Sequence, residues 1–290
     1  MSATHSNPDL HCHSVVSDGT LTPEELAARA KGNGVDLWAL TDHDEVGGQS
    51  RALAGARAQG LNYLTGVEIS VTFADTTVHI VGLGFDHTDP RLVQGLADTR
   101  DGRGPRAIEM GEQLARAGIP GAYAGALRYA GNPALISRTH FARFLVETGV
   151  CKDTNEVFRK YLVEGKPGYV PHRWARLGDA VRWITQCGGV AVVAHPARYH
   201  FNATVEYALL SEFQQHGGQA IEVVTGSHTA AEARRYADLA REMHLAASRG
   251  SDFHSPGESH ADLGQLAPLP ADLTPVWSLL ADRIHHPAET

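Results

Sequence analysis

Histidines and carboxylates stand close together at several points of this 290-residue sequence. His11 and His13 are two residues apart, and so are Asp252 and His254. Side chains two apart on a strand project to the same side, so both members of a pair can reach one ion. The sequence has 17 histidines but only three cysteines, which show no Cys-x-x-Cys spacing. This composition indicates imidazole and carboxylate metal chemistry, and it disfavours a disulfide framework or a zinc ribbon.

Further polar residues of this kind follow short apolar segments that read as strands. Most of them fall at or just beyond the C-terminal end of a predicted parallel strand, where α/β barrels place their active sites. Burying so many ionisable groups together would cost several kcal/mol each unless metal ions compensated them. The sequence therefore predicts a metal centre built from the groups His11 and His13, Asp18, Asp42-His43-Asp44, Glu68, His79, His195, and Asp252 with His254.

The elements that must position these groups alternate between strand and helix. Thr22-Pro23-Glu24-Glu25 is typical of a helix start, with Thr22 as N-cap and Glu25 closing a capping box. Repeated strand–helix units at this spacing indicate a mostly parallel sheet or barrel. We expect a first barrel part over residues 1–96, a helical insertion over 97–168 and a second barrel part over 169–290.

Within the insertion, apolar residues at helical spacing predict helices over 108–117, 140–147 and 155–162. The stretch 98–106 is rich in charge and glycine, so we expect an exposed linker, although its arginines could approach a substrate.

The bulk composition limits the class of protein. A hydrophobic content of 42 % with mixed charge is typical of a soluble globular chain. The net charge of −8 argues against broad binding to polyanions, although bound metal ions would reverse the field locally. Neither a signal peptide nor a membrane-length apolar run is evident, so we expect a cytoplasmic protein with no membrane association. No sequence feature indicates a stable protein partner.

Six motifs, taken in order, resemble those of the PHP (polymerase and histidinol phosphatase) domain family of the amidohydrolase superfamily. They are Asp9-Leu-His-Cys-His13, Ser17-Asp18-Gly19, Thr41-Asp42-His43-Asp44, Gly66-Val-Glu68, Ala194-His195-Pro196 and Gly250-Ser-Asp-Phe-His254. The segments 137–145, 165–171 and 195–199 are similar to a bacterial branch that includes 3′,5′-nucleoside bisphosphate phosphatases and 5′-to-3′ exoribonucleases.

This resemblance implies a distorted (β/α)7 barrel, with the helical insertion capping its C-terminal face, and a centre of three divalent metal ions. An aspartate at position 18, where some relatives have histidine, favours Mn²⁺ or Fe²⁺ over Zn²⁺. We expect Mn²⁺, with Fe²⁺ or Zn²⁺ as alternatives. Carried over residue by residue, the first ion would bind His11, His13, Glu68 and Asp252; the second Asp18, His43 and His254; and the third His79 and His195, with Glu68 bridging.

Clustered divalent ions would generate a bridging hydroxide and clamp the phosphoryl oxygens. Asp42 and Asp44 either donate a proton to the leaving group or orient His43. Beyond the metals, we expect a second phosphate of the substrate to meet Ser137, Arg138, His140 and Arg198, and less strongly Lys166, His172, Arg173 and Arg176. A base could stack on Tyr129, Tyr169, Trp174 or Phe253. The catalytic residues would be Asp18, His43, Asp252 and His254.

The resulting functional prediction is a metal-dependent phosphoesterase that removes the 3′-phosphate of 3′,5′-nucleoside bisphosphates such as pAp. Its substrate would be a small nucleotide, with short 5′-phosphorylated RNA, trimmed from the 5′ end, as a further substrate. One alternative is a histidinol-phosphate phosphatase, which needs no separate arginine anchor. An alternative of another class is a catalytically silent PHP binding module, which the full set of nine ligand positions disfavours.

Overall fold

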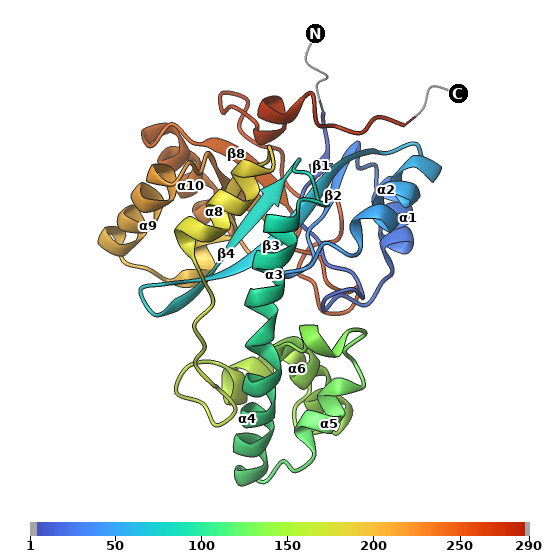
Figure 1. The fold of residues 1–290 in the computed structure, drawn as a ribbon, viewed down its shortest axis with the longest axis vertical. Coiled ribbons are helices and arrows are strands. Elements are labelled where there is room, and N and C mark those ends of the chain that lie inside the picture. The colour runs from blue at the N-terminus through green and yellow to red at the C-terminus, as the bar shows by residue number, and fades with distance from the viewer. Residues whose placement is uncertain (1–4, 288–290) are drawn as a thin grey trace.

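A computed structural model, which describes residues 5–287, places the strands in a nearly closed barrel (Figure 1). Seven strands follow one another in the order β1-β2-β3-β4-β6-β7-β8, while β5 pairs only with β3. The ring of strands closes between β1 and β8, where the amide of Leu10 donates to the carbonyl of Arg249 at 3.0 Å. The predicted seven-stranded barrel is confirmed. Its strands are β1 (Pro8–Asp9), β2 (Leu37–Leu40), β3 (Asn62–Phe73), β4 (Thr76–Leu83), β5 (Ala175–Arg176), β6 (Val190–Val193), β7 (Ala220–Thr225) and β8 (Ala246–Gly250).

One strand runs against the others. β4 is antiparallel to both of its neighbours, β3 and β6, whereas the other described strand pairs are parallel. The cause is the two-residue turn of Ala74 and Asp75, whose φ angles of 46° and 59° make a tight hairpin. As a result, His79 lies near the start of its strand, opposite Ser70, and still reaches the rim where the parallel strands end.

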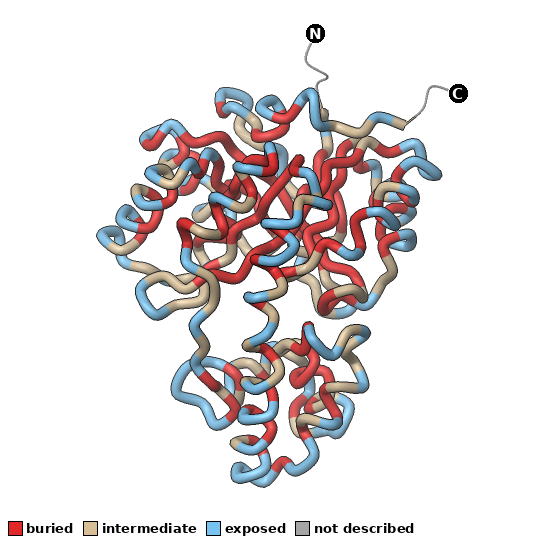
Figure 2. The backbone as a smooth tube through the Cα atoms, in the orientation of Figure 1, coloured by how far each residue is buried: buried red, intermediate tan, exposed pale blue. Residues whose placement is uncertain are grey.

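Helices cover the outside of the barrel, with α1 and α2 on one side and α8, α9 and α10 on the other (Figure 1). The strands between them are mostly buried, apart from β5 and the ends of β3 and β4 at their hairpin (Figure 2). The capping box predicted at Thr22 and Glu25 is present at the start of α1. The helices of the barrel are α1 (Pro23–Gly32), α2 (Gln49–Ala58), α3 (Pro90–Asp101), α8 (Leu177–Gln186), α9 (Ala203–Gln215) and α10 (Ala230–Glu242), with the 3-10 turns η3 (Pro196–Tyr199) and η4 (Val276–Leu280).

A second group of helices projects from the barrel and packs around its own apolar cluster, which includes Met110, Leu114, Phe141 and Leu145 (Figure 1). The division at residue 97 falls inside α3, so the boundaries 1–96, 97–168 and 169–290 remain our proposal. The elements of this group are α4 (Arg103–Arg116), α5 (Ala122–Leu127), η1 (Pro133–Leu135), α6 (Arg138–Glu147), α7 (Thr154–Val157) and the π-helical turn η2 (Phe158–Leu162).

The stretch 98–106 is helical, and the prediction of an exposed linker is wrong. Gly102 joins α3 to α4 in helical conformation (φ −76°, ψ −14°), so the two helices form one long column. A Cβ atom at this position would lie 2.1 Å from the ring of His172, so a larger residue here would displace that side chain. Pro105 is tolerated because it lies in the first turn of α4. Arg103, which we expected at the surface, is buried.

The projecting helices contact the barrel at its carboxyl-terminal rim. On α6, the guanidinium of Arg143 donates to the carboxylate of Glu258 in the loop after β8, with a shortest distance of 2.7 Å. At the N-terminus of the same helix, the hydroxyl of Ser137 donates to Asp18 at 3.0 Å. The insertion therefore lies over the rim on which the predicted metal ligands stand. No helix within residues 5–287 has the length and hydrophobicity that a membrane span requires.

Candidate active site

Glu68 lies at the centre of the predicted ligand set. Its Oε1 atom is 2.9 Å from Nδ1 of His79, 2.9 Å from Nε2 of His195 and 3.3 Å from Nε2 of His11. Its Oε2 atom is 2.8 Å from Nδ1 of His43 and also contacts His13. One buried carboxylate thus meets five imidazoles contributed by four different segments of the barrel rim.

The remaining ligand candidates complete two further groups beside Glu68. Oδ1 of Asp252 lies 3.2 Å from Nε2 of His13 and 3.5 Å from Nε2 of His11. Oδ1 of Asp18 lies 3.4 Å from Nε2 of His254 and 3.8 Å from Nε2 of His43. The structure therefore brings all nine sequence-predicted ligands together. Their donor atoms fall into four overlapping groups that could hold ions: His13-Asp18-His43-His254, His11-Glu68-His195, His11-His13-Asp252 and His43-Glu68-His79.

The chemistry of these atoms fits divalent cations. The Nε2 atoms of His11 and His13 lie only 3.2 Å apart, and buried atoms such as Nδ1 of His13 and Oδ1 of Asp18 have no hydrogen-bond partner among the described residues. Burial opposes the charged form of Glu68, but His79, His43 and His11 outweigh it and hold its pKa well below the usual range. Burial lowers the pKa of His13 to about 3, which leaves its imidazole neutral. At His254, by contrast, Asp18 and Asp252 outweigh the effect of burial and raise the pKa to about 9, so an ion bound there would displace a proton from this imidazole.

A carboxylate outside the ligand set, that of Glu222, holds two of the ligands in place. Glu222 on β7 accepts hydrogen bonds from Nδ1 of His11 at 2.8 Å and from the amide of His195 at 2.7 Å. A carboxylate behind a metal-binding histidine fixes its tautomer and orientation. We missed Glu222 in the sequence, although a charged residue inside the buried strand Ala220–Thr225 was a signal for it.

Asp42 and Asp44, which follow β2, are both engaged as acceptors away from the pocket. Asp42 accepts from the hydroxyls of Ser14 (2.7 Å) and Ser17 (2.6 Å), and so fixes the turn that carries Asp18. Asp44 accepts from the amide of Ser70 at 2.7 Å and pairs with the buried guanidinium of Arg103. These contacts do not involve His43, so they support neither of our two alternatives directly: Asp42 positions the turn of Asp18, and Asp44 positions Ser70 and Arg103.

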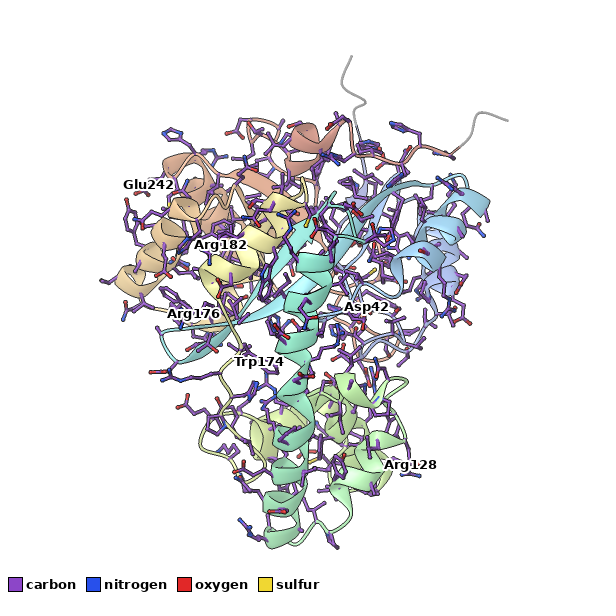
Figure 3. The ribbon with its side chains drawn as sticks, viewed as in Figure 1. Asp42, Arg128, Trp174, Arg176, Arg182 and Glu242 are labelled. Carbon is purple, nitrogen blue, oxygen red and sulfur yellow. The ribbon has the colours of Figure 1, made fainter. Side chains whose placement is uncertain are left out.

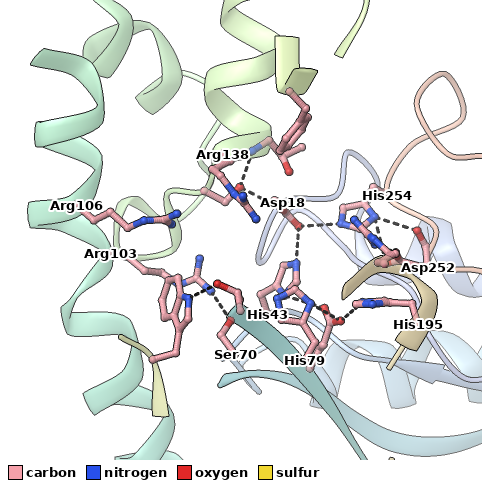
Figure 4. Close-up of a pocket in the computed structure, with 17 residues that line it drawn as sticks. Asp18, His43, Ser70, His79, Arg103, Arg106, Arg138, His195, Asp252 and His254 are labelled. Atoms are coloured by element: carbon pink, nitrogen blue, oxygen red, sulfur yellow. Dashed lines mark hydrogen bonds and ion pairs between the residues drawn. The ribbon is translucent and has the colours of Figure 1, made fainter. Parts of the chain in front are cut away.

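Four arginines line the same pocket as the metal-ligand candidates, and three of them come from the projecting helices (Figure 4). Arg103 and Arg106 come from α4, and Arg138 comes from the start of α6. Arg106 donates to the carbonyl of Val170 at 2.9 Å, and no carboxylate pairs with it or with Arg138 within residues 5–287. Burial, together with the neighbouring Arg138 and Arg103, lowers the pKa of Arg106 to about 9. Arg103, Arg106 and Arg138 together form a positively charged arginine wall, whose charge a bound anion would neutralise.

Trp174 fixes two of these arginines. Its ring lies 4.7 Å from the guanidinium carbon of Arg103 and 5.4 Å from that of Arg106. Its indole nitrogen donates to Thr77 on the barrel at 3.1 Å, so the ring joins the two parts of the molecule (Figure 3). Two of the residues predicted to stack a base thus have different positions. Trp174 lines the pocket, with its ring already in contact with two arginines, and Phe253 is buried in the core.

Only some of the predicted substrate-binding residues line the pocket. Ser137 and Arg138 line the pocket, and Arg198 lines it while donating to Oδ2 of Asp252 at 2.6 Å. His140, by contrast, is fully buried and does not line the pocket. Its Nδ1 accepts from the amide of Ser137 at 3.0 Å, and burial lowers its pKa to about 4. Direct substrate contact by His140 does not fit this position. The weaker candidates Tyr129, Lys166, Tyr169, His172, Arg173 and Arg176 also lie outside the lining of this pocket.

Comparison with known proteins agrees with this arrangement. The PHP domain family matches residues 9–162. The chain is 51 % identical to a 3′,5′-nucleoside bisphosphate phosphatase of Chromobacterium violaceum, over 98 % of this chain and 100 % of that protein. It is 43 % identical to a 5′-3′ exoribonuclease of Escherichia coli, over 93 % of this chain and 92 % of that protein.

Solved structures show the same fold. An amidohydrolase from Chromobacterium violaceum, 51 % identical, superimposes with a TM-score of 0.95 and covers 98 % of this chain and 99 % of its own. A protein assigned as a metal-dependent phosphoesterase from Bifidobacterium adolescentis, 26 % identical, has a TM-score of 0.78, covering 93 % of this chain and 95 % of its own. By sequence and by fold, this chain belongs to the PHP domain family.

Proposed function

We propose that the protein is a metal-dependent phosphoesterase that releases the 3′-phosphate of 3′,5′-nucleoside bisphosphates, such as pAp. The observation that carries this proposal is the arginine wall, Arg103, Arg106 and Arg138, which faces the metal-ligand cluster across one pocket. A substrate that fills both sides must carry two phosphates, one for hydrolysis and one for recognition. A short RNA with a 5′-phosphate presents the same two groups, and trimming of such RNA is the second activity we propose.

The nine clustered ligands would hold three divalent ions, for which Mn²⁺ is our first choice. When bound, such ions supply hydroxide near neutral pH and neutralise charge on phosphoryl oxygens. The chain's own residues position the reactants. Glu222 orients His11, Ser137 orients Asp18, and His140 supports Ser137 from behind. Asp18, His43, Asp252 and His254, which line the pocket, would be the catalytic residues among the ligands.

The arginines have distinct roles in this proposal. Arg106 and Arg138, which have no carboxylate partner among the described residues, bind the 5′-phosphate. Arg103 already pairs with Asp44 and completes the wall as a fixed charge. Arg198 lies beside Asp252, so it contacts the phosphoryl group at the metals instead of the distant phosphate.

Two alternatives fit the site less well. A histidinol-phosphate phosphatase would leave the arginine wall without an anion. A silent binding module would not need all nine ligands at contact distance. The similarity to proteins named as a phosphatase and as exoribonucleases supports the enzymatic reading.

The test is a side-by-side assay of the metal-loaded protein on pAp, 3′-AMP and histidinol phosphate, with phosphate release and AMP formation measured. We expect kcat/KM to be highest for pAp, and lower for 3′-AMP by about 10- to 100-fold because one charge-assisted anchor is absent. Equal turnover of pAp and 3′-AMP would contradict the anchor. A preference for histidinol phosphate would overturn the proposed substrate class.

A further inference from the structure

A second hollow of about 430 Å³ adjoins the metal-ligand cluster. It shares five lining residues with the arginine-walled pocket, and these mark the junction between the two spaces. Two of the five, Asp252 and His254, are predicted metal ligands. The group that undergoes hydrolysis would therefore sit between the two spaces. The shared residues are Thr139, Phe158, Arg198, Asp252 and His254.

The two spaces differ in charge. The first pocket has Arg103, Arg106 and Arg138 as its wall. The second contains none of these, and its only arginine is the shared Arg198. Its remaining walls are mainly hydroxyl, amide and imidazole groups, and Glu258, its acidic member outside the ligand set, is already paired with Arg143. The first pocket suits a doubly charged terminal phosphate, and the second suits a sugar and base with little charge.

The walls of the second hollow come from both parts of the chain. Asn155 lies on α7 of the insertion, Ser227 follows β7, and Ser259 and His260 lie in the loop after β8. The ring of Phe158 borders the space and is the aromatic surface on which a base could stack. A volume of this size lies within the roughly 300–1,000 Å³ of small-ligand pockets.

We propose that this hollow is the subsite for the downstream nucleotide of a short RNA, the one whose 5′ oxygen carries the scissile phosphate. The inference rests on the proposed function, in particular on the trimming of RNA, and assigns the nucleotide downstream of the cleaved bond to a place in the structure. In pApA, the first nucleotide places its 5′-phosphate on the arginine wall, the internal phosphate lies at the metal-ligand cluster, and the second nucleoside enters the hollow beside Phe158, Asn155 and His260.

The reaction at this site balances without any co-reactant other than water. A hydroxide oxygen forms a bond to the internal phosphorus, and the bond between that phosphorus and the 3′ oxygen of the first nucleotide breaks. The leaving 3′ oxygen takes up a proton. From pApA both products are AMP. From a longer RNA the products are a nucleoside 5′-monophosphate and a shortened RNA with a new 5′-phosphate, which is again a substrate. In pAp the second nucleoside is absent, and the hollow holds solvent.

The test is a substitution that fills the second hollow and leaves the lining of the first pocket unchanged. Asn155 is exposed and lines only the second space, so Asn155→Trp would fill that space and leave the arginine wall unchanged. His260→Ala is a smaller change in the opposite wall. We expect Asn155→Trp to lower kcat/KM for pApA by roughly tenfold or more, which corresponds to the loss of about one base–aromatic contact, while the value for pAp stays the same. We expect His260→Ala to lower kcat/KM for pApA by a smaller factor and to leave pAp turnover unchanged.

The matched control is Val163→Trp, which adds the same bulk at an exposed position just after η2, outside both spaces. It should leave both substrates unaffected. Unchanged pApA turnover in Asn155→Trp, or equal losses for pAp and pApA, would overturn the subsite. If the wild-type protein hydrolyses pAp but not pApA, the subsite fails and the proposed phosphatase stands. If it hydrolyses neither, the proposed function itself fails.

Discussion

The hydroxyl of Ser137 donates a 3.0 Å hydrogen bond to Oδ2 of Asp18, and this contact joins the insertion to a predicted metal ligand. Ser137 is also the N-cap of α6, where its oxygen accepts from the amide of Thr139. The same side chain thus starts a helix and holds a carboxylate of the metal cluster. The structure of the insertion and the geometry of the cluster are therefore linked by one residue.

Ser137→Ala should cost about 1 kcal/mol in the free energy of unfolding, as for other helix N-caps, and weaken metal binding by about 10- to 100-fold. Thr229→Ala is the matched control, because Thr229 caps α10 with a capping box of the same kind and lines neither pocket. Chemical denaturation and metal titration should show similar stability losses in both variants but weaker metal binding only in Ser137→Ala. Equal metal affinity in the two would show that the contact with Asp18 has no effect.

Arg106→Ala should raise KM for pAp while leaving turnover of 3′-AMP nearly unchanged, because the lost guanidinium faces only the 5′-phosphate. The expected loss in kcat/KM for pAp is about 10- to 100-fold, the effect of one charged hydrogen-bond donor. Arg116→Ala, on the exposed end of the same helix, removes an equal charge and should have no effect on either substrate. Parallel losses on pAp and 3′-AMP would place Arg106 outside the anchor.

Glu222→Gln should weaken metal binding by about 10- to 100-fold, because an amide orients His11 less strongly than a carboxylate. The contrasting variant is Glu206→Gln. Glu206 is also buried, but it accepts from Tyr236 and Arg235 on the outside of the barrel. It should lower the melting temperature and leave the bound metal unchanged. Metal analysis and thermal melts distinguish the two, and a metal-replete Glu222→Gln enzyme would contradict the orienting role.

Removal of divalent ions by chelation should abolish activity and lower the melting temperature, because ions that bind only the folded chain stabilise it. Re-addition of Mn²⁺ should restore both properties, with three ions bound per chain. Asp252→Asn should bind fewer ions and lose turnover. A fully active Asp252→Asn protein that keeps its ions would defeat the ligand assignment, and a count of two ions would remove one of the three sites.

The metal cluster could be predicted from the sequence because each part of it is encoded locally. A histidine pair or an aspartate follows a short apolar strand, and the barrel brings those strand ends together. His79 reaches the rim for a different reason, the reversal of β4 by the turn at Ala74 and Asp75, and the predicted mostly parallel sheet did not contain that reversal.

The arginine wall could be predicted only in part. Arg138 stood in a recognisable motif, whereas Arg103 and Arg106 lay in a stretch whose glycines and proline resembled a linker. The overlooked signal was the spacing of Ala107, Met110 and Leu114, which continues the helical pattern back toward Arg103. The role of Gly102 depends on its contact with His172, about 70 residues later, and no local pattern reveals such a contact.

The reversal of β4 carries the chain back to the far end of the barrel, and the column of α3 and α4 must return along the outside to reach the rim (Figure 1). Each residue of a helix adds about 1.5 Å of length and about 100° of rotation. The number of residues in this column therefore sets both the position and the direction of the side chains on α4. Adding or removing one residue between Pro90 and Arg103 would turn the guanidinium groups of Arg103 and Arg106 away from the metal-ligand cluster, even if every side chain stayed the same.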